Sequence, residues 1–365
     1  MTQPLFTPAK AGAIEAGNRI AMAPLTRNRA DNVTGEVGDM HVDYYRQRAG
    51  AGIIITEATQ ISPEGKGYLQ TPGIHTPGQA AAWRRVTDAV HEAGGKIVVQ
   101  LWHVGRISHT SLQPDGQPPV APSALNAGSK TFTAKGFENT SDPRALELAE
   151  MPRIVADYAH AAAMALEAGF DGVEVHGANG YLLDQFLKTG SNHRDDAYGG
   201  SVENRARLLL EVMEAVTRVW GGDRVGLRLS PFSPANGISD DNPQETFEYV
   251  IKALNRFGLA YLHLVEGATG GSRALQEGQS IDRLRKLFEG PYMANNGYDR
   301  EMALKAVAEG HADFIAIGRP FIANPDLVAR YERDLPLAEG DQSTYYGGGR
   351  EGYTDYPAAV AQAAE

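Results

Sequence analysis

The chain has 365 residues, with 34 Lys and Arg residues against 45 Asp and Glu residues, and its formal net charge is −11. This length fits two average domains or one large α/β barrel with insertions, and the negative charge, without a basic run, disfavours nucleic acid and anionic membranes as partners. The chain has no cysteine, which excludes disulfides, thiolate nucleophiles and cysteine-ligated metals, so redox chemistry would need a bound cofactor.

Short apolar runs alternate along the chain with longer stretches of helical period. The predicted strands are residues 20–24, 52–57, 96–102, 172–176, 225–229, 261–265, 292–294 and 314–317. The predicted helices are residues 41–49, 77–93, 152–168, 202–219, 243–257, 280–288, 300–309 and 324–331. Eight strands separated by helices predict an α/β protein with a closed (β/α)8 TIM barrel, and an open eight-stranded sheet is the alternative.

Several of these helices have recognisable ends. Ser201 is placed to cap the helix at 202–219, and the pair Gly221-Gly222 is placed to stop it. Other helices end just before Gly94, Gly169 and Gly310, where glycine favours a left-handed C-cap. These signals strengthen the assignment of the helices.

The segment 104–150 breaks the alternation because it is rich in Pro, Gly, Ser and Asn and has no helical period. It follows the third predicted strand, at the barrel face where active sites lie, and connections of this length usually carry a function. We therefore expect residues 104–150 to form a lid over that face, which could include a hairpin; a disordered insertion is the alternative. No linker divides the chain, so residues 1–365 are expected to form a single domain.

Polar side chains gather where the predicted strands end. The early strands offer uncharged hydrogen-bonding groups, the fifth strand carries an arginine, and the eighth is followed by a Gly-Arg pair. Such a set would suit a planar heteroaromatic ring with a phosphate tail. The residues at these positions are Pro24, Leu25, Thr26, Glu57, Ala58, Gln100, Trp102, His176, Asn179, Tyr181, Arg228, Asn296, Gly297, Gly318 and Arg319. The phosphate would lie on the backbone N–H groups of Gly297 and Gly318 and on Arg319.

The densest polar cluster is residues 176–186. His176 and Asn179 could both donate hydrogen bonds to one substrate oxygen, and Tyr181 could deliver a proton nearby. Each residue alone has a structural alternative: a satisfied buried histidine, a capped tyrosine, or an inter-strand ion pair for Arg228. By the same reasoning, Tyr68, Trp102 and Tyr353 would by default be core aromatic residues.

Other sequence patterns carry less information. Gly347, Gly349 and Gly352 match G-x-G-x-x-G, but no predicted strand precedes them and no helix follows, so the match is rejected as a dinucleotide site. The ten histidines are scattered, and no metal site is indicated. No apolar stretch approaches a membrane span, and the residues before Lys10 lack a secretory pattern, so a cytoplasmic location is expected.

Six ordered segments together resemble one family, the Old Yellow Enzyme family of FMN-dependent ene-reductases. They are residues 22–27, 100–109, 176–186, 198–205, 318–327 and 352–357, and the resemblance extends from Leu5 to Pro357. It implies an FMN-binding barrel in which Thr26 hydrogen-bonds the flavin O4. Pro24, Leu25 and Ala58 would then form a floor under the flavin ring. Gln100 and Arg228 would hold its pyrimidine edge.

The resemblance also implies roles at the substrate side. His176 and Asn179 would bind the activating oxygen of the substrate, Tyr181 would protonate the carbon next to the activating group, and Tyr68, Trp102 and Tyr353 would line the pocket. The segment 293–297 lacks the Ala-Gly pair of many relatives, so the phosphate-binding amide at Gly297, with Asn296 beside it, could differ by one residue.

The resulting prediction is a flavin-dependent oxidoreductase that works in two half-reactions. NADPH or NADH would reduce FMN, and an electron-poor alkene or a nitro compound would then be reduced in the same pocket, with the protein a monomer or a homodimer. Three alternatives stay open: an FMN barrel that acts on RNA, a flavin-free phosphosugar isomerase or aldolase, and a non-catalytic flavin carrier.

Overall fold

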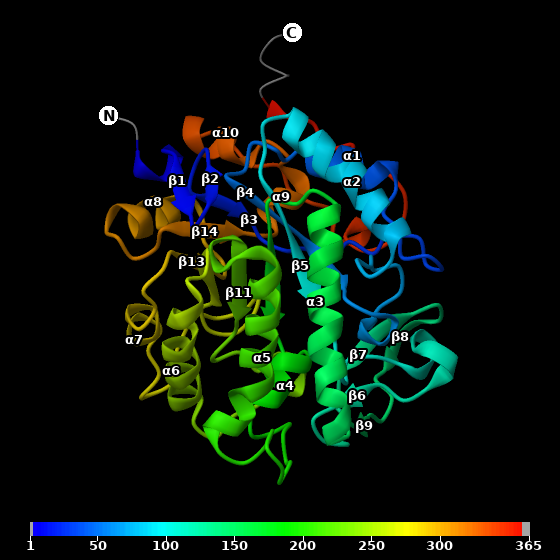
Figure 1. Cartoon of the computed structure of the whole chain (residues 1–365). Helices are drawn as coiled ribbons and strands as arrows, with labels where there is room; N and C mark the ends of the chain where they lie inside the picture. The colour runs from blue at the N-terminus through cyan, green and yellow to red at the C-terminus, as the bar shows by residue number, and fades with distance from the viewer. Residues whose placement is uncertain (1–2, 360–365) are drawn as a thin grey trace.

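The computed structural model describes residues 3–359, so the first and last residues of the predicted domain lie outside it. Eight parallel strands close into a barrel (Figure 1). In barrel order they are β3 (Ile20–Met22), β4 (Ile53–Gln60), β5 (Ile97–Trp102), β10 (Gly172–Gly177), β11 (Val225–Leu229), β12 (Tyr261–Val265), β13 (Tyr292–Asn295) and β14 (Phe314–Ile317). All eight predicted strands are therefore confirmed, and pairing of Ile315 with Ile20 closes the barrel and excludes the open sheet.

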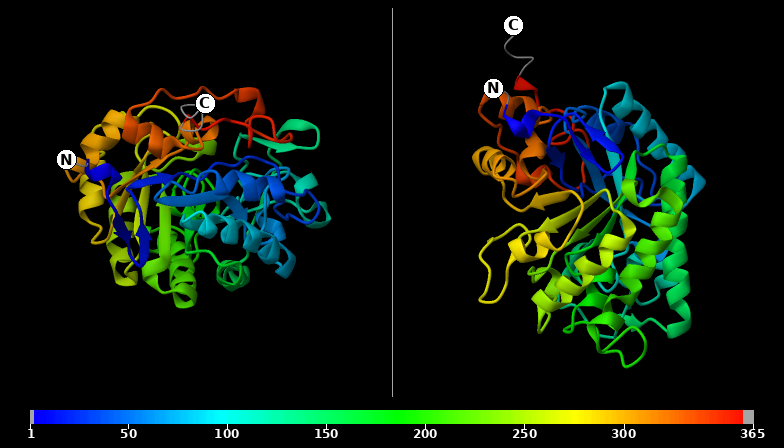
Figure 2. Two further views of the ribbon diagram at one scale, coloured as in Figure 1. Left: turned by 90° about the horizontal axis from the view of Figure 1, so that it is seen from above. Right: turned by 60° about the vertical axis from the view of Figure 1, so that its left-hand side comes forward.

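Helices surround the barrel on its outer side (Figure 2). They are α1 (Asp39–Arg46), α2 (Pro77–Glu92), α3 (Met151–Glu167), α4 (Leu182–Leu187), α5 (Val202–Trp220), α6 (Pro243–Leu254), α7 (Ile281–Lys286), α8 (Arg300–Ala308), α9 (Pro320–Ala323) and α10 (Leu327–Arg333). Apolar residues recur at helical spacing along the long helices, so each of these helices has one apolar face. These faces pack against the strands and form the main core.

The helix ends follow the predicted capping chemistry. The hydroxyl of Ser201 accepts a hydrogen bond from the backbone N–H of Asn204, which caps α5. Gly94, Gly169 and Gly310 have φ values of 80°, 77° and 68°, the left-handed conformation in which a residue with a Cβ would be strained. These turns direct each chain segment from a helix into the next strand.

The barrel interior holds its own apolar cluster, which includes Ile53, Val98, Met293 and Phe314. Pairing between β4 and β5 shifts register between Ile55 and Ala58. This irregularity extends β4 beyond the predicted end at residue 57 and pairs Ala58 with Gln100, so both residues reach the mouth of the barrel side by side.

The insertion 104–150 contains short strands and single turns of 3-10 helix but no α-helix. Strands β7 (Lys130–Thr133) and β8 (Gly136–Asn139) form an antiparallel hairpin, and β6 (Val120–Ala121) pairs with β9 (Arg144–Ala145). The backbone N–H of Leu69 donates to the carbonyl of Phe132 at 2.8 Å. This bond attaches the hairpin to the connection between β4 and α2.

Some elements have no counterpart in the sequence prediction. A hairpin of β1 (Ala9–Ala11) and β2 (Ile14–Ala16) precedes the barrel, and the short helices α4 and α9 follow β10 and β14. Among residues 3–359, no helix combines the length and the apolar character needed to cross a membrane.

Candidate active site

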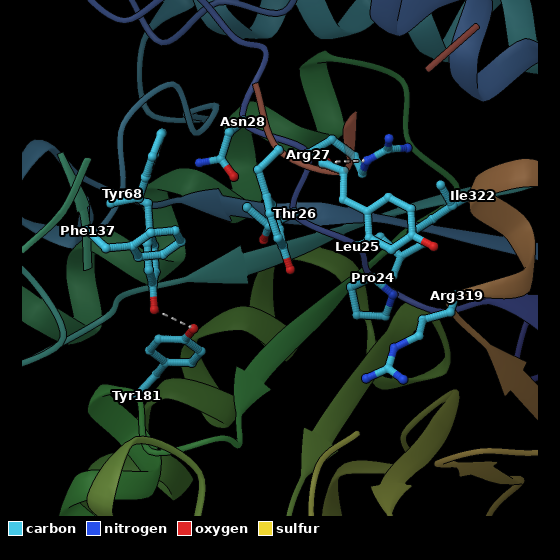
Figure 3. A pocket seen from close by; sticks show the side chains of 13 residues that line it. Pro24, Leu25, Thr26, Arg27, Asn28, Tyr68, Phe137, Tyr181, Arg319 and Ile322 are labelled. Atoms are coloured by element: carbon cyan, nitrogen blue, oxygen red, sulfur yellow. Dashed lines mark hydrogen bonds between the residues drawn. The ribbon is translucent and has the colours of Figure 1, made fainter. Parts of the chain in front are cut away.

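Two cavities meet at the carboxyl ends of the barrel strands. Pro24, Leu25 and Arg319 line both of them, so the segment after β3 is a floor that the two cavities share (Figure 3). In a barrel this face is the one where active sites are built.

We call the first of these the aromatic cavity; its volume is about 380 Å³. Figure 3 shows Tyr68, Phe137 and Tyr181 on one side of it and Arg319 across from them. A wall of this kind accommodates flat apolar molecules, while a few polar groups fix their orientation. Its full lining adds Thr26, Arg27, Asn28, Phe132, Ile322, Tyr345 and Tyr346.

We call the second the polar cavity; its volume is about 310 Å³. It brings together Arg228, Arg319, Gly297 and Gly318, all of which the sequence predicts at a phosphate-bearing cofactor. A Cβ built on Gly297 would meet no atom within 4 Å, so the backbone there is open to a ligand. The buried Nε of Arg228 has no hydrogen-bond partner within residues 3–359. The guanidinium of Arg319 and the open backbone at Gly297 therefore fit the phosphate of FMN, and the unpaired Nε–H of Arg228 fits an acceptor atom elsewhere on the cofactor.

The orientation of Arg228 is set by a residue that the sequence reasoning did not single out. Its Nη2 donates to Oδ1 of Asn295 at 2.9 Å, and Nδ2 of Asn295 donates to the carbonyl of Ala316 at 2.7 Å. Burial lowers the pKa of Arg228, and the nearby Glu174 opposes that effect. The guanidinium stays protonated at neutral pH, so it presents a fixed positive charge.

Gln100 is also held in one orientation. Its Nε2 donates to Oε1 of Glu174 at 2.7 Å, and Nδ1 of His263 lies 2.8 Å from the other carboxylate oxygen. Burial alone would raise the pKa of Glu174, but His263 and Arg228 outweigh it and lower the pKa. The ionised carboxylate takes one N–H of Gln100 and fixes the amide, so its Oε1 can accept from a ligand N–H and its second N–H can donate.

His176 is a neutral hydrogen-bond donor in this environment. Burial, together with the charge of Arg228, holds its pKa well below the ordinary value. Its Nδ1 accepts from the backbone N–H of Ala178 at 3.2 Å. The proton of the neutral ring is therefore on Nε2, which can donate to a substrate oxygen.

Asn179 presents a donor for a similar reason. Its Oδ1 accepts from the hydroxyl of Thr269 at 2.7 Å, which leaves the Nδ2 hydrogens available. Its backbone is left-handed, with φ of 59°, and its N–H donates to the hydroxyl of Ser230 at 2.7 Å. The buried carboxylate of Asp184 accepts from the N–H of Gly180 at 2.9 Å, which fixes the same turn.

Tyr181 lies next to this donor pair. Its ring centroid is 5.0 Å from that of His176, and its hydroxyl oxygen is 3.1 Å from that of Tyr68. Burial raises the pKa of Tyr181, while a hydrogen bond from Tyr68 acts in the opposite direction. The phenol is thus protonated at neutral pH, as a proton donor must be.

Several predicted site residues are buried behind the cavity surfaces. Trp102 is 1% exposed and stacks on Tyr68 at a centroid distance of 5.6 Å, and Ala58 belongs to the same apolar cluster. Thr26, by contrast, lines the aromatic cavity directly.

The expectation that Tyr353 lines the pocket is wrong in this structure. Tyr353 is fully buried and stacks on Tyr44 at 4.2 Å with an interplanar angle of 12°, while Tyr345 and Tyr346 line the aromatic cavity. The motif indicated the correct segment of chain, but the direction of each side chain depends on how that irregular segment folds back.

The side chain of Asn296 is committed to the protein. Its Nδ2 donates to the carbonyls of Glu266 and Ala268, and its Oδ1 accepts from the N–H of Gly270. Only its backbone is left for a ligand, which supports Gly297 and its neighbours as the phosphate-binding amides.

Other residues reach the site from loops that local sequence pattern does not mark. Asn236 donates through Nδ2 to the carbonyl of Asn179 at 2.9 Å and accepts through Oδ1 from the hydroxyl of Ser129 at 3.1 Å. It therefore links the insertion to the turn after β10. The Ser-Pro pairs and the Asn236-Gly237 pair of this loop mark turns, but they do not indicate which residues the loop contacts.

Comparison with known proteins gives consistent matches. The family described as NADH:flavin oxidoreductase / NADH oxidase matches residues 4–338. The chain is 46% identical over 362 residues to 12-oxophytodienoate reductase 1 of Oryza sativa subsp. japonica, covering 97% of this chain and 93% of that protein.

Solved structures of similar proteins also match over nearly their whole length. Morphinone reductase in complex with tetrahydroNAD has 49% identity and a TM-score of 0.91, with 97% of each chain covered. The Old Yellow Enzyme homologue from Zymomonas mobilis has 45% identity and a TM-score of 0.93, covering 97% of this chain and 99% of that one.

Proposed function

The chain belongs to the NADH:flavin oxidoreductase / NADH oxidase family, the Old Yellow Enzyme family, and is a flavin-dependent NAD(P)H oxidoreductase; from this premise we propose that it reduces the activated C=C bond of α,β-unsaturated carbonyl or nitro compounds. Membership in a flavin family leaves no support for the isomerase or aldolase alternative. Electron-poor alkenes, nitro compounds and a nicotinamide coenzyme are the small-molecule partners of this proposal, with NADPH favoured over NADH.

The proposed cofactor site is the polar cavity and the floor that it shares with the aromatic cavity. Arg319, Gly297 and Gly318 would hold the phosphate of FMN, and Gln100 and Arg228 would hold the pyrimidine edge of its ring. Thr26 would contact the flavin O4 above Pro24 and Leu25. Bound FMN would supply the hydride transfer between the nicotinamide and the acceptor carbon.

The proposal rests chiefly on one observation: the site has two free donors and one protonated phenol within a single turn. His176 offers Nε2–H and Asn179 offers Nδ2–H because their other polar atoms are occupied. Both would donate to the carbonyl or nitro oxygen and stabilise negative charge that develops on it. Tyr181 would then protonate the carbon next to the activating group.

The remaining parts of the site have supporting roles in this proposal. Tyr68 and the other aromatic residues would hold the flat acceptor and the nicotinamide in turn, and the insertion 104–150 would cover this face as a lid. The whole chain would act as one FMN-binding unit, as a monomer or a homodimer in the cytoplasm.

Anaerobic stopped-flow measurements test the proposal by separating the two half-reactions. The protein should carry a yellow flavin that NADPH bleaches and 2-cyclohexenone reoxidises. Tyr181→Phe should slow reoxidation by the enone at least tenfold and leave bleaching by NADPH unchanged, because only the former step needs the proton donor. Equal loss in both half-reactions would count against this role, and failure of the wild-type protein to reduce any enone or nitroalkene would refute the proposed function.

A further inference from the structure

A segment near the C-terminus forms one wall of the aromatic cavity. Tyr345 and Tyr346 line this cavity together with the hairpin residues Phe132 and Phe137, and the chain near the C-terminus is drawn in red in Figure 2. We call residues 344–353 the C-terminal strap. The side chain of Tyr346 is 58% exposed, so its own packing does not hold it in position.

Two buried arginines bind the backbone of the strap. Nε and Nη2 of Arg27 donate to the carbonyls of Tyr345 and Gly352, both at 2.8 Å. Nε and Nη2 of Arg29 donate to the carbonyls of Gly349 at 3.0 Å and Thr344 at 2.9 Å. The strap has almost no regular secondary structure, so these guanidinium groups satisfy carbonyls that a helix or sheet would otherwise pair.

The strap accepts most of the hydrogen bonds that these two arginines donate. Arg27 and Arg29 are 1% and 6% exposed, and neither forms a salt bridge within residues 3–359. Burying two guanidinium groups costs free energy unless they are fully hydrogen-bonded, and their partners are mostly backbone carbonyls of the strap. In addition, the N–H of Gly347 donates to the carbonyl of Arg27 at 2.9 Å.

Tyr353 anchors the end of the strap against the same pair. The guanidinium carbon of Arg29 lies 4.4 Å from the ring centroid of Tyr353, and that of Arg27 lies 5.0 Å away. The ring of Tyr353 also stacks on that of Tyr44. The strap is therefore fixed by hydrogen bonds along its length and by an aromatic anchor at its end.

We propose that Arg27 and Arg29 are positioning residues for substrate binding, which fix the C-terminal strap so that Tyr345 and Tyr346 form a wall of the aromatic cavity. The identity of the substrate class rests on the proposed function. Arg27 adjoins Thr26 and the shared floor, so the same arginine pair sets the distance between the floor and the wall. Loss of Arg29 should loosen the wall and weaken binding of a cyclic enone without removing the cofactor.

The test compares Arg29→Gln with Arg350→Gln, the same substitution at an exposed arginine of the strap that reaches Asp43 at the surface. Arg29→Gln should raise the KM for 2-cyclohexenone about tenfold, with kcat changed less than twofold and FMN content unchanged. Hydrogen exchange of the amides of residues 344–353, followed by mass spectrometry, should become faster. Arg350→Gln should change none of these quantities.

An unchanged KM in Arg29→Gln, an equal KM change in both variants, or loss of FMN with the change in KM would overturn the assignment. A measurement on the wild-type protein covers the case in which Arg29→Gln does not fold: saturating 2-cyclohexenone, without NADPH, should slow amide exchange in the strap at least threefold, and no slowing would overturn the proposal. Amide hydrogen exchange in the strap can be measured without turnover. Failure of the wild-type enzyme to reduce the enone would therefore refute the proposed function without deciding the role of the strap.

Discussion

The hydrogen bond between the hydroxyl groups of Tyr68 and Tyr181 joins the connection after β4 to the proposed proton donor. Burial raises the pKa of Tyr181, and the bond from Tyr68 partly offsets that rise. Tyr68→Phe would remove the offset, so Tyr181 should become a weaker acid. We expect reoxidation of the reduced flavin by 2-cyclohexenone to slow about fivefold, the equivalent of a hydrogen bond of roughly 1 kcal/mol.

Stopped-flow measurements check this expectation, with reduction by NADPH as the internal control. An unchanged rate of reoxidation in Tyr68→Phe would show that the hydroxyl pair has no part in proton transfer.

Glu57 links stability to pH. It is fully buried near His41 and Tyr45, and burial raises its pKa from 4.5 to about 7. Because the pKa is higher in the folded protein, its contribution to stability is fully present below about pH 4.5 and is lost as the pH rises through about 7. The difference corresponds to roughly 3 kcal/mol.

Glu57→Gln removes this titration, so its free energy of unfolding should fall less between pH 5 and pH 8 than that of the wild-type protein. Denaturant unfolding at the two pH values measures the difference, and Glu92→Gln, at an exposed position on α2, is the matched control. Parallel curves for Glu57→Gln and the wild-type protein would contradict the expectation.

Among the elements, the hairpin of β7 and β8 contributes aromatic side chains to the aromatic cavity without being part of the barrel. Phe137 lines the cavity yet is 65% exposed, so it contributes little to folding. Phe137→Ser should leave the midpoint of thermal unfolding within about 1 °C while raising the KM for 2-cyclohexenone severalfold, because an apolar contact with the acceptor is lost.

Steady-state kinetics and thermal unfolding measure the two effects side by side. Leu148→Ser is the control, because Leu148 is an exposed apolar residue of the same insertion and lies outside both cavities. A KM that does not move in Phe137→Ser would argue against a role of the hairpin in binding the substrate.

At the scale of the whole molecule, the polar cavity joins the loops that follow β3, β10, β12, β13 and β14 to Arg228 of β11. A ligand that binds only the folded barrel stabilises it by mass action, by about 2.7 kcal/mol at a concentration 100 times its Kd. FMN added to the apoprotein should therefore raise the unfolding temperature by several degrees. Riboflavin, which lacks the phosphate, should raise it less.

Arg319→Gln tests the source of this difference. If Arg319 binds the phosphate, the variant should show a smaller difference between the responses to FMN and to riboflavin than the wild-type protein in a thermal unfolding assay. An undiminished preference for FMN would place the phosphate elsewhere.

The sequence by itself determined the architecture and most of the candidate site. Alternating apolar runs and helix ends such as Ser201 and Gly221 depend on local chemistry, so eight strands and their helices could be predicted within a few residues. The carboxyl ends of the barrel strands meet at one face. The sequence alone therefore predicts one site that contains Arg228, Gly297, Gly318 and Arg319.

The tertiary structure alone decided how side chains in irregular segments point and which polar atoms remain free. Tyr353 turned out to be a buried anchor and Tyr346 a cavity wall, although both lie in the same glycine-rich segment. The donors of His176 and Asn179 are defined by partners such as Thr269, which is 90 residues away in sequence. Irregular backbone is stabilised by distant groups, as the strap is by Arg27 and Arg29, and no local periodicity records such contacts.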